Sequence, residues 1–385
     1  MRRVALAVHP APVLAGRASH CLGLGSSAPP QASTLEDLVT SVPPPDDQRV
    51  GTPLRRRRKA VWWVLGTLLV LVLGAGAVAV TYLGGLASTF DNTTEKFETA
   101  FPEEDQRPTK APAREGRQEP VNILLLGSDS GGGSGETEDL ADVPQAGRSD
   151  TMMWVHIPGD RQKIFVMSVM RDLWVEIPGQ GEHKLNAAYS FGGVPLAVQT
   201  LESMFGTRID HVAAVDLEGF RGIVDALGGV TIDNPRAFTS GNGGRDFAAG
   251  PQTMDGDTAL SFVRERYAFS DGDYSRVRNQ QLFLRAVLSE VLDTRTLTNP
   301  GLISDMVEEL SPYLTVDDTL DSADMVSIGR TLTGIRKDDL EMFTVPTEGI
   351  GRARGQSVVW PDWDGIRSIG TGLQEDSLAD HLPSN

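Results

Sequence analysis

The sequence predicts a layered α/β domain that follows a single membrane-spanning helix. Two observations carry this prediction. Between residues 120 and 346, short apolar runs of strand length alternate with segments of helical periodicity. Before them, residues 60–88 form one apolar run without a charged residue. The composition, 40% hydrophobic and 23% charged residues among 385, is ordinary for a globular protein and excludes collagen-like and wholly disordered chains.

The apolar run is long enough to cross a membrane, and we expect the transmembrane helix at residues 60–83. About 20 apolar residues span the roughly 30 Å of hydrocarbon in a bilayer. Trp62, Trp63 and Tyr82 lie near its ends, where aromatic residues favour the membrane interface. A buried core helix and a cleaved signal peptide are the alternatives. The length of the run disfavours the first, and its position far from the start of the chain disfavours the second.

A basic cluster at residues 55–59 directly precedes the span. By the positive-inside rule that end is cytoplasmic, so we expect a single-pass protein of the cell membrane with its amino terminus inside and its folded domain outside. Residues 1–59 are rich in Pro, Ala, Ser and Gly without periodicity, which predicts a disordered cytoplasmic tail. A wrongly assigned start codon is the alternative. The one cysteine, Cys21, falls on the reducing side.

Three further segments complete the predicted organisation. Residues 89–119 are polar and rich in Pro, Glu, Lys and Arg, which is typical of a stalk. Residues 120–346 carry the globular pattern. Residues 347–385 are rich in Gly and Asp, and we expect them to be loosely ordered.

The elements of the domain follow from apolar spacing and from Gly and Pro at their ends. We expect strands at residues 121–126, 152–157, 163–169, 173–177, 212–215, 230–232 and 340–345. We expect helices at residues 184–191, 194–205, 217–227, 255–263, 274–292 and 322–332. The pair Gly192-Gly193 separates the first two helices, and Gly228-Gly229 ends the third.

Charge is unevenly distributed, and this excludes one class of function. The net charge is −17, and the residues after 60 hold 26 basic and 48 acidic side chains, a net charge of −22. So acidic a domain is a poor general nucleic-acid binder, because phosphate backbones require clustered positive charge. The chain also lacks the H-E-x-x-H and G-x-S-x-G motifs, which argues against a zinc protease and a serine hydrolase.

Two acids lie at the ends of predicted strands. Asp129 closes the segment NILLLGSD, and Asp150 precedes the next strand along the chain. Ligand sites of open α/β sheets lie at strand ends, and two carboxylates can share a hard cation such as Mg²⁺. The alternative for each is a turn or capping aspartate.

Basic residues gather at other element ends. Arg171 follows a strand, and a surface ion pair with Asp172 is its alternative role. Lys184 lies at a predicted helix start, where an anionic ligand would explain a lysine, and a solvated cap is its alternative role. In an extended segment Arg264 and Arg266 point to the same side, where two guanidinium groups suit a pyrophosphate. A favourable arginine at a helix carboxyl end is the alternative.

One polar pair lies on a helix face that otherwise becomes apolar. Arg276 and Gln280 are four residues apart and share that face. Continuing the face leads to Phe283 and Val287. The pair therefore heads a buried stripe, which solubility does not explain.

Together these segments resemble the LytR-CpsA-Psr family. The resemblance runs from about Val121 to Val345 and includes the single amino-terminal span. The segments that carry it are NILLLGSD (122–129), RSDTMM (148–153), SVMRDLWVEIPG (168–179), KLNAAYSFGG (184–193), IDHVAAVDLEGFRGIVDALGGV (209–230), MDGDTALSFVRER (254–266) and DYSRVRNQQ (273–281). Their order and spacing make the resemblance specific.

The resemblance implies a three-layer α/β/α domain around a central, mostly mixed sheet. It implies Mg²⁺-assisted transfer of a phosphoglycan from a polyprenyl-pyrophosphate carrier to a peptidoglycan hydroxyl, with a possible pyrophosphatase side activity. A greasy pocket would hold the polyprenyl tail. Asp129 and Asp150 match the metal-binding acids, and Arg171 and Arg266 match residues of the catalytic machinery. The residues that match the pyrophosphate-binding set are Arg171, Lys184, Arg264, Arg266, Arg276 and Gln280.

Two departures and two alternatives stand beside this resemblance. Asn279 occupies a position where the family often has arginine, and the loop from Ser130 to Gly147 is long. One alternative is a catalytically silent polyprenyl-phosphate-binding or scaffold protein of the cell envelope. The other is a membrane-anchored transcription regulator, which would need a DNA-binding part in residues 1–59, where no helix-turn-helix pattern occurs.

Overall fold

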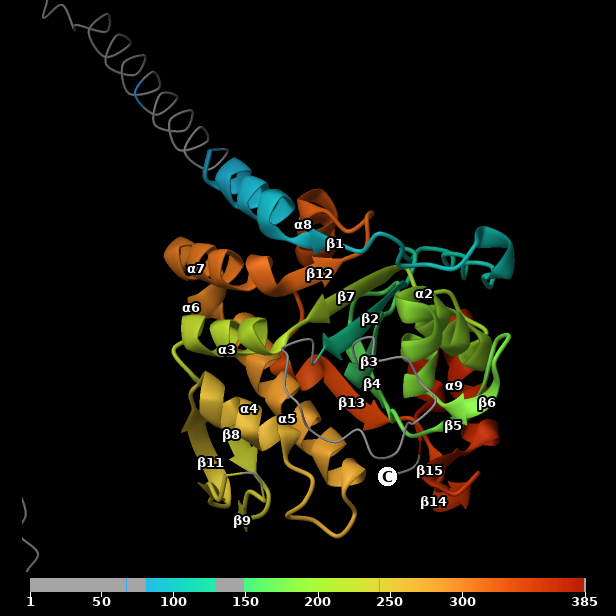
Figure 1. Cartoon of the computed structure of the whole chain (residues 1–385). Helices are drawn as coiled ribbons and strands as arrows, with labels where there is room; N and C mark the ends of the chain where they lie inside the picture. The colour runs from blue at the N-terminus through green and yellow to red at the C-terminus, as the bar shows by residue number, and fades with distance from the viewer. Residues whose placement is uncertain (1–66, 68–80, 129–148, 242, 384–385) are drawn as a thin grey trace, which may run out of the picture. The chain divides into compact units, whose positions relative to one another are not determined.

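A computed structural model gives the architecture of the domain (Figure 1). It describes residues 67, 81–128, 149–241 and 243–383. The predicted cytoplasmic tail and nearly all of the predicted span at residues 60–83 lie outside this part of the chain. Within it, no helix combines the length and apolarity needed to cross a bilayer.

A mixed sheet of seven strands forms the centre of the domain. In spatial order its strands are β1 (Glu95–Lys96), β12 (Leu314–Val316), β7 (His211–Val215), β2 (Val121–Ser128), β3 (Ser149–Ile157), β4 (Ile164–Val169) and β13 (Leu340–Thr344). Strands β2, β3 and β4 are antiparallel neighbours, whereas β7 runs parallel to β2 and β13 runs parallel to β4. The predicted α/β class and its mixed sheet are confirmed.

Helices lie on both sides of this sheet (Figure 1). One side carries α2 (Asn186–Phe205) and α9 (Trp363–Gln374). The other side carries α3 (Leu217–Ala226), α4 (Gly256–Arg264), α5 (Asp273–Val291), α6 (Thr294–Leu297), α7 (Pro300–Leu310) and α8 (Ser322–Thr331). Residues 81–93 form a further helix that leads into β1. The arrangement has three layers, helices, sheet and helices.

Smaller elements complete the fold. The two-stranded sheets pair β5 (Trp174–Ile177) with β6 (Gly181–Lys184), β8 (Val230–Asn234) with β11 (Gly250–Met254), β9 (Phe238–Thr239) with β10 (Asp246–Phe247), and β14 (Thr347–Ala353) with β15 (Gln356–Pro361). Short 3₁₀ turns are η1 (Glu104–Gln106), η2 (Ser311–Tyr313), η3 (Lys337–Asp339) and η4 (Leu378–His381).

The two faces of the sheet differ in how completely they are covered. Along β2, Leu124 and Leu126 are buried in the core under α2 and α9, as strand alternation requires. Their neighbours Ile123 and Leu125 point to the opposite face and are only partly buried, beside α5 and α8. A central strand covered on both sides would bury both sets, so this second face is incompletely closed.

The predicted break in the first helical segment is confirmed. The structure contains one element, α2, with non-helical backbone at Gly192 and Gly193. Gly193 has φ 64°, a conformation that glycine adopts without steric cost. The kink directs both halves of α2 against the sheet.

The predicted loosely ordered carboxyl-terminal segment is wrong. Residues from Thr347 onward form the β14–β15 hairpin and α9. Helix α9 buries Ile366, Ile369 and Leu373 completely against the core. The high Gly content misled the prediction, because one of these glycines, Gly370, allows close packing: a Cβ there would lie 2.4 Å from the carbonyl oxygen of Phe205.

The predicted stalk at residues 89–119 is also wrong for much of its length. Residues 95–96 form the edge strand β1 beside β12. Arg107 forms a bidentate contact with Glu202, and the two side chains are 5% and 1% exposed. These polar residues find partners far away in the chain, which local composition does not reveal.

Candidate functional site

Four predicted cations meet around two carboxylates that the sequence analysis did not assign to the site. This cationic cluster consists of Arg171, Lys184, Arg266 and Arg276 with Asp172 and Asp273. Nη2 of Arg276 donates a 2.8 Å hydrogen bond to Oδ2 of Asp273, and Nε of Arg171 lies 3.4 Å from the same oxygen. Nζ of Lys184 lies 3.2 Å from Oδ1 of Asp172. The charge of Arg266 also acts on Asp273. The cluster is built from four separate stretches of the chain.

Lys184 reaches the cluster from an element other than the predicted one. It was expected at a helix start, but it is the last residue of β6, and α2 begins at Asn186. Pairing of Trp174 with Lys184 in the β5–β6 hairpin holds it there. The prediction started the helix too early, because a short strand directly precedes it and has no distinct apolar pattern of its own.

The two carboxylates differ in their affinity for a proton. Burial raises the pKa of Asp172, and the nearby charge of Asp273 raises it further, against the opposing effect of Arg171. Burial alone would also raise the pKa of Asp273, but Arg276 and Arg171 hold it below its usual value. With four cations and two carboxylates, the cluster carries net positive charge. It suits an anionic ligand.

Gln280 connects helix α5 to the start of β3. Its Nε2 donates a 2.8 Å hydrogen bond to Oγ1 of Thr151. Of Asp150, the neighbouring residue, the structure describes the backbone as the second residue of β3. Asp129 lies outside the described residues, so the predicted metal-binding role of both acids stays a prediction. Elsewhere in the described chain no group of three His, Cys, Asp or Glu residues has the geometry of a metal site.

A buried acid separates the two predicted arginines. Arg264 ends α4 with an exposed side chain, outside the contacts that define the cationic cluster. Glu265 follows in an extended conformation and is 1% exposed. Its Oε2 accepts hydrogen bonds from Oγ of Ser240 at 2.5 Å and from the backbone N of Gly241 at 2.9 Å, and its Oε1 accepts from the backbone N of Ala268 at 2.8 Å. Successive side chains of an extended segment alternate, so an inward Glu265 directs both neighbours outward.

Glu265 was not predicted as part of the site. An acid between two arginines has the pattern of a local ion pair, and nothing nearby indicates burial. Burial alone would raise the pKa of Glu265, but the Ser240 hydroxyl and the backbone amides lower it, so the residue is a buried anion. It acts as an anchor for the segment that carries Arg264 and Arg266.

Asn279 has a structural role where the family often has arginine. It is 6% exposed, and its Nδ2 donates a 3.0 Å hydrogen bond to the carbonyl oxygen of Phe262. This bond joins α5 to the last turn of α4, one turn before Glu265. Asn279 therefore supports the segment that leads from α4 to Arg266.

Beyond the cationic cluster, one face of α5 is apolar. This apolar lining consists of Leu284 and Leu288. The sequence predicted that the face of Arg276 and Gln280 continues to Phe283 and Val287. Those two residues are instead buried in a separate core with α3 and α4. Leu284 and Leu288 continue the stripe of Arg276 and Gln280 at intervals of four. These leucines are partly buried beside Ile123, Leu125 and Val155 on the incompletely closed face of the sheet.

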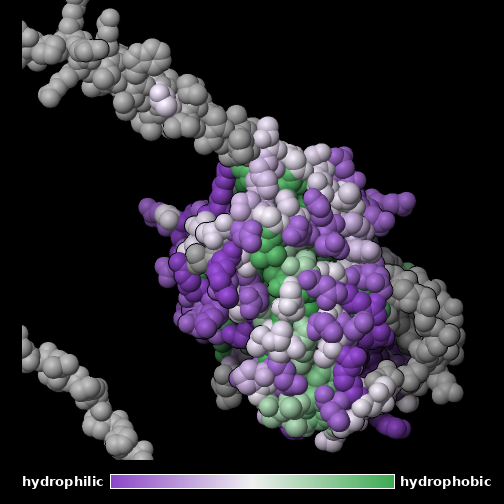
Figure 2. Space-filling model, turned by 90° about the vertical axis from the view of Figure 1, so that its left-hand side faces the viewer, coloured by the Kyte–Doolittle hydropathy of each residue, from purple (hydrophilic) through white to green (hydrophobic). Residues whose placement is uncertain are grey.

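The same side of the molecule also has apolar residues at its surface. Figure 2 shows a band of them between hydrophilic flanks, on the side that carries α3 and α7. In α3, Phe220 and Ile223 are only partly buried, as is Leu227 directly after the helix.

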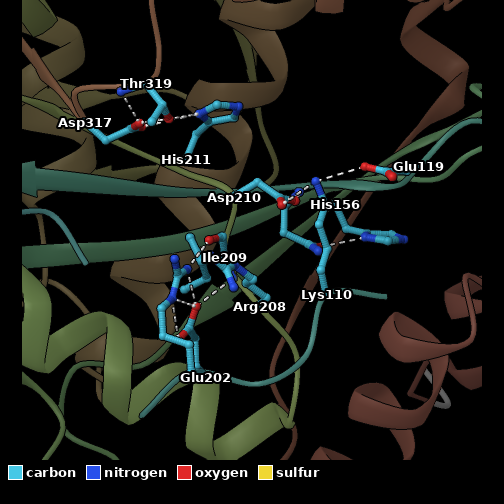
Figure 3. A network of polar contacts seen from close by, with 12 residues as sticks. Lys110, Glu119, His156, Glu202, Arg208, Ile209, Asp210, His211, Asp317 and Thr319 are labelled. Atoms are coloured by element: carbon cyan, nitrogen blue, oxygen red, sulfur yellow. Dashed lines mark hydrogen bonds and ion pairs between the residues drawn. The ribbon is translucent and has the colours of Figure 1, made fainter. Parts of the chain in front are cut away.

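A second polar network lies at the other end of the sheet (Figure 3). It surrounds a pocket of about 610 Å³ whose lining includes Lys110, Asp210 and His211. Nζ of Lys110 lies 3.2 Å from Oδ1 of Asp210, and Nδ1 of His211 lies 3.4 Å from Oδ2 of Asp317. Burial would raise the pKa of Asp317, but hydrogen bonds from His211, Thr319 and Val212 lower it to about 2. Because these charges satisfy one another, the network supports the fold, and the cationic cluster is the better candidate for ligand binding.

Comparisons with known proteins identify the family of the chain. The model of the LytR_cpsA_psr family matches residues 86–371. A relative from Bacillus anthracis, named polyisoprenyl-teichoic acid–peptidoglycan teichoic acid transferase TagU, is 33% identical over 267 residues, covering 69% of this chain and 82% of the relative.

Solved structures share the fold. The crystal structure of TagV from B. subtilis has a TM-score of 0.56 and 24% identity, covering 69% of this chain and 100% of that one. A LytR-Csp2A-Psr enzyme from Actinomyces oris has a TM-score of 0.54 and 21% identity, covering 76% and 96%. The family match extends beyond both ends of the resemblance seen in the sequence, into the segments predicted as stalk and loose tail. The chain belongs to the LytR-CpsA-Psr family.

Proposed function

We propose that this protein transfers a phosphoglycan from a polyprenyl-pyrophosphate carrier to a hydroxyl group of peptidoglycan. The observation that carries the proposal is that the cationic cluster heads an apolar lining on α5. A head of positive charge joined to an apolar surface matches a lipid with a diphosphate head group. The name of the B. anthracis relative, a teichoic acid transferase acting between a polyisoprenyl carrier and peptidoglycan, supports the same class of reaction.

The cationic cluster supplies what phosphoryl transfer requires of a protein. Such reactions need positioning and stabilisation of negative charge more than covalent chemistry. In the proposed complex, Arg171, Arg266 and Arg276 donate paired N–H groups to diphosphate oxygens. Lys184 adds a point charge beside Asp172. Gln280, held by Thr151, contributes an amide at the boundary between head group and tail.

The apolar lining would hold the first isoprene units of the carrier. Leu284 and Leu288 lie one and two turns beyond Gln280, toward the incompletely closed face of the sheet. Burying isoprene surface there contributes about 25 cal/mol per Å². The tail therefore extends away from the cations along α5.

The proposed reaction is a displacement at phosphorus. The oxygen of the acceptor hydroxyl forms a bond to the phosphorus that carries the glycan, and the bond from that phosphorus to the bridging oxygen breaks. Polyprenyl phosphate leaves with the electron pair, and the hydroxyl proton passes to a base. Asp129 and Asp150 are the two candidate bases. If water replaces the acceptor, the same displacement gives a pyrophosphatase side reaction.

We propose Mg²⁺ as the cofactor, held by carboxylate oxygens of Asp129 and Asp150. Support comes from the chemistry of these ligands and from the place of Asp150 at the beginning of β3, beside Thr151. When bound, the ion would offset negative charge on the diphosphate. The arginines of the cationic cluster would orient the head group through hydrogen bonds to its oxygens.

The predicted span at residues 60–83 would keep the domain close to a donor that is itself embedded in the membrane. Its orientation, with residues 55–59 inside, would place the domain outside the cytoplasm, where peptidoglycan lies. We therefore propose a single-pass membrane protein with an extracytoplasmic catalytic domain.

The test is a transfer assay with the full chain in detergent, a sugar-capped polyprenyl diphosphate and soluble peptidoglycan. We expect Mg²⁺-dependent formation of polyprenyl phosphate together with glycan-bearing peptidoglycan. Arg266→Ala should fold normally and lose about 10²–10³ in rate, as removal of one charge-stabilising donor typically does. A wild-type protein that binds the lipid and releases no polyprenyl phosphate would contradict transfer and favour a silent lipid-binding role.

A further inference from the structure

The hairpin β14–β15 is attached directly to the cationic cluster. The backbone N of Val359 in β15 donates a 2.9 Å hydrogen bond to the carbonyl oxygen of Asp172. Oγ1 of Thr347 in β14 shares a 2.7 Å hydrogen bond with the hydroxyl of Tyr274, the residue after Asp273. Figure 1 shows the hairpin beside β5. Both strands are therefore fixed to the segments that carry the two carboxylates of the cluster.

One face of this hairpin is open to solvent. Along β14, exposed and partly buried residues alternate, with Glu348, Ile350 and Arg352 on the exposed face. Ile350 is 61% exposed, which is high for a large apolar side chain. On the other face, Trp360 lies against Gly351, where a Cβ would be 2.1 Å from the indole Nε1. Glycine at 351 is required for the indole to lie across the strand.

The turn of the hairpin has an arginine in an unfavourable backbone conformation. Arg354 has φ 49° and Gly355 has φ 80°. A two-residue turn with both φ values positive favours Asn, Asp or Gly at its first position, because a larger side chain there is strained. The side chain of Arg354 is exposed, and its guanidinium lies 5.4 Å from the ring centroid of Trp174.

The other non-glycine residues with positive φ have structural reasons for it. The guanidinium of Arg161 donates to the carbonyl oxygens of Pro158 and Glu119. The carboxylate of Asp376 accepts from the backbone N of Gly159. Arg354 has a ring contact, since its guanidinium lies over Trp174, which is 5% exposed, but the arginine side chain itself stays exposed. The exposed charge of Arg354 is therefore held at a fixed position beside the site, where a ligand can reach it.

Charge indicates the kind of ligand. Residues 349–361 contain two arginines, Arg352 and Arg354, and no acid, within a chain of net charge −17. In the part of the chain that the structure describes, neither arginine has an ion-pair partner within 4.0 Å. Glu348 is the acid that precedes them on the same face. The surface thus complements a ligand with carboxylates at intervals and an apolar or sugar face for Ile350.

We propose that the exposed face of the β14–β15 hairpin binds the acceptor, an N-acetylated glycan strand that carries peptide carboxylates, through Arg352 and Arg354. This assignment rests on the proposed transfer reaction and adds the surface that presents the acceptor. A strand bound along the hairpin lies next to Asp172 and the cluster, so its hydroxyl groups come within reach of the head group of the carrier. The hairpin binds through charge and sugar contact, and the cluster binds the diphosphate.

The test measures binding without turnover, on the full chain in detergent micelles. The probe is a fluorescent disaccharide–pentapeptide oligomer with free carboxylates, titrated in the absence of carrier lipid. We expect Arg354→Asn and Arg352→Ala each to weaken binding about tenfold, the loss of one charge-assisted contact. A neutral N-acetylglucosamine oligomer should bind weakly and be insensitive to both changes. Arg330→Ala on α8, also an exposed arginine, is the matched control and should leave binding unchanged.

Stability separates a binding role from a structural one. Arg354→Asn places a residue favoured by the turn, so the unfolding temperature should be maintained or raised while affinity falls. Affinity for the sugar-capped polyprenyl diphosphate should stay at the wild-type value. An Arg352→Ala/Arg354→Asn double variant that binds the carboxylated oligomer within twofold of wild type overturns the assignment. If the arginines govern oligomer binding but the wild type transfers nothing, the proposed reaction fails and the glycan-binding surface remains.

Discussion

Nε of Arg171 lies 3.4 Å from Oδ2 of Asp273, so the segment after β4 and the first residue of α5 meet through opposite charges. Arg276 contacts the same carboxylate oxygen from one turn further along α5. Asp273 therefore contacts two arginines of the cluster. Burial raises the pKa of Asp172, beside it.

Donor binding should depend on pH through Asp172. Its pKa is raised above the usual value, chiefly by burial, so as pH rises through that pKa the cluster gains a negative charge and binds a diphosphate less tightly. The ligand to use is a sugar-capped polyprenyl diphosphate, because its phosphates are diesters and do not titrate in this range. Isothermal titration from pH 4 upward measures the effect. Asp172→Asn, which mimics the protonated form, should give a flat profile, and an unchanged slope in that variant would exclude Asp172 as the titrating group.

Glu265 should act on ligand binding through Arg266. In Glu265→Gln the side-chain amide has one acceptor oxygen, whereas Glu265 accepts from Gly241 and Ala268 with different oxygens. We expect a loss of about 1–3 kcal/mol in stability and about tenfold in affinity for the diphosphate lipid. A double-mutant cycle with Arg266→Ala separates the two effects. Additive losses of affinity in the cycle would show that Glu265 does not position that arginine.

His156 should make the domain less stable as pH falls from about 6.5 to about 4. The ring is completely buried, and burial lowers its pKa to about 4, whereas the unfolded chain titrates near 6.5. The unfolded state binds the proton first, so the stabilisation is complete above about pH 6.5 and about 3 kcal/mol of it is lost by pH 4. Urea unfolding at several pH values measures this slope. His156→Gln should remove it.

The loss due to His156 can be distinguished from that due to Asp317. Asp317 has its pKa lowered to about 2, so its contribution is present above the usual value near 3.8 and is lost only as pH falls toward 2. Asp317→Asn should therefore lower stability above pH 4, remove the pH dependence of stability between about 4 and 2, and leave the slope between 4 and 6.5 in place. If His156→Gln retains the wild-type slope in that higher range, another group is responsible.

Helix α9 should be required for the stability of the whole domain. Ile369 is fully buried in the core that also contains α2 and the sheet. Ile369→Ala should lower the free energy of unfolding by about 2–5 kcal/mol, the usual range for a large-to-small change in a core. The exposed Thr371→Ala on the same helix is the control and should change it little. Equal, small effects of both substitutions would mean that α9 docks only loosely.

Local patterns predicted most of the sheet but not the attachments at its ends. The apolar run at residues 121–126 predicts β2 because strand periodicity is a property of neighbouring residues. Gly192-Gly193 likewise predicts the kink in α2 from local backbone freedom. Helix α9 packs against Phe205, and Arg107 pairs with Glu202, both far away in the chain. The Gly-rich and polar composition around these segments predicts loose structure instead.

The basic residues of the site could be predicted from the sequence, but the acidic residues that hold them in place could not. Arg171 and Arg276 were placed at element ends, and the fold brings these ends together. Glu265 was missed because its burial is decided by Ser240 and Gly241 in another loop. Asp273 was missed because an acid in the first turn of a helix is ordinarily explained by the helix dipole. The roles of Glu265 and Asp273 depend on tertiary contacts, which one sequence does not reveal.

A crystal structure of the protein with a sugar-capped polyprenyl diphosphate tests the account most directly. We predict diphosphate oxygens within hydrogen-bonding distance of Arg171, Arg266 and Arg276, with the first isoprene units against Leu284 and Leu288 of α5. A diphosphate bound away from these arginines, or a tail that leaves the apolar lining of α5 empty, would contradict it.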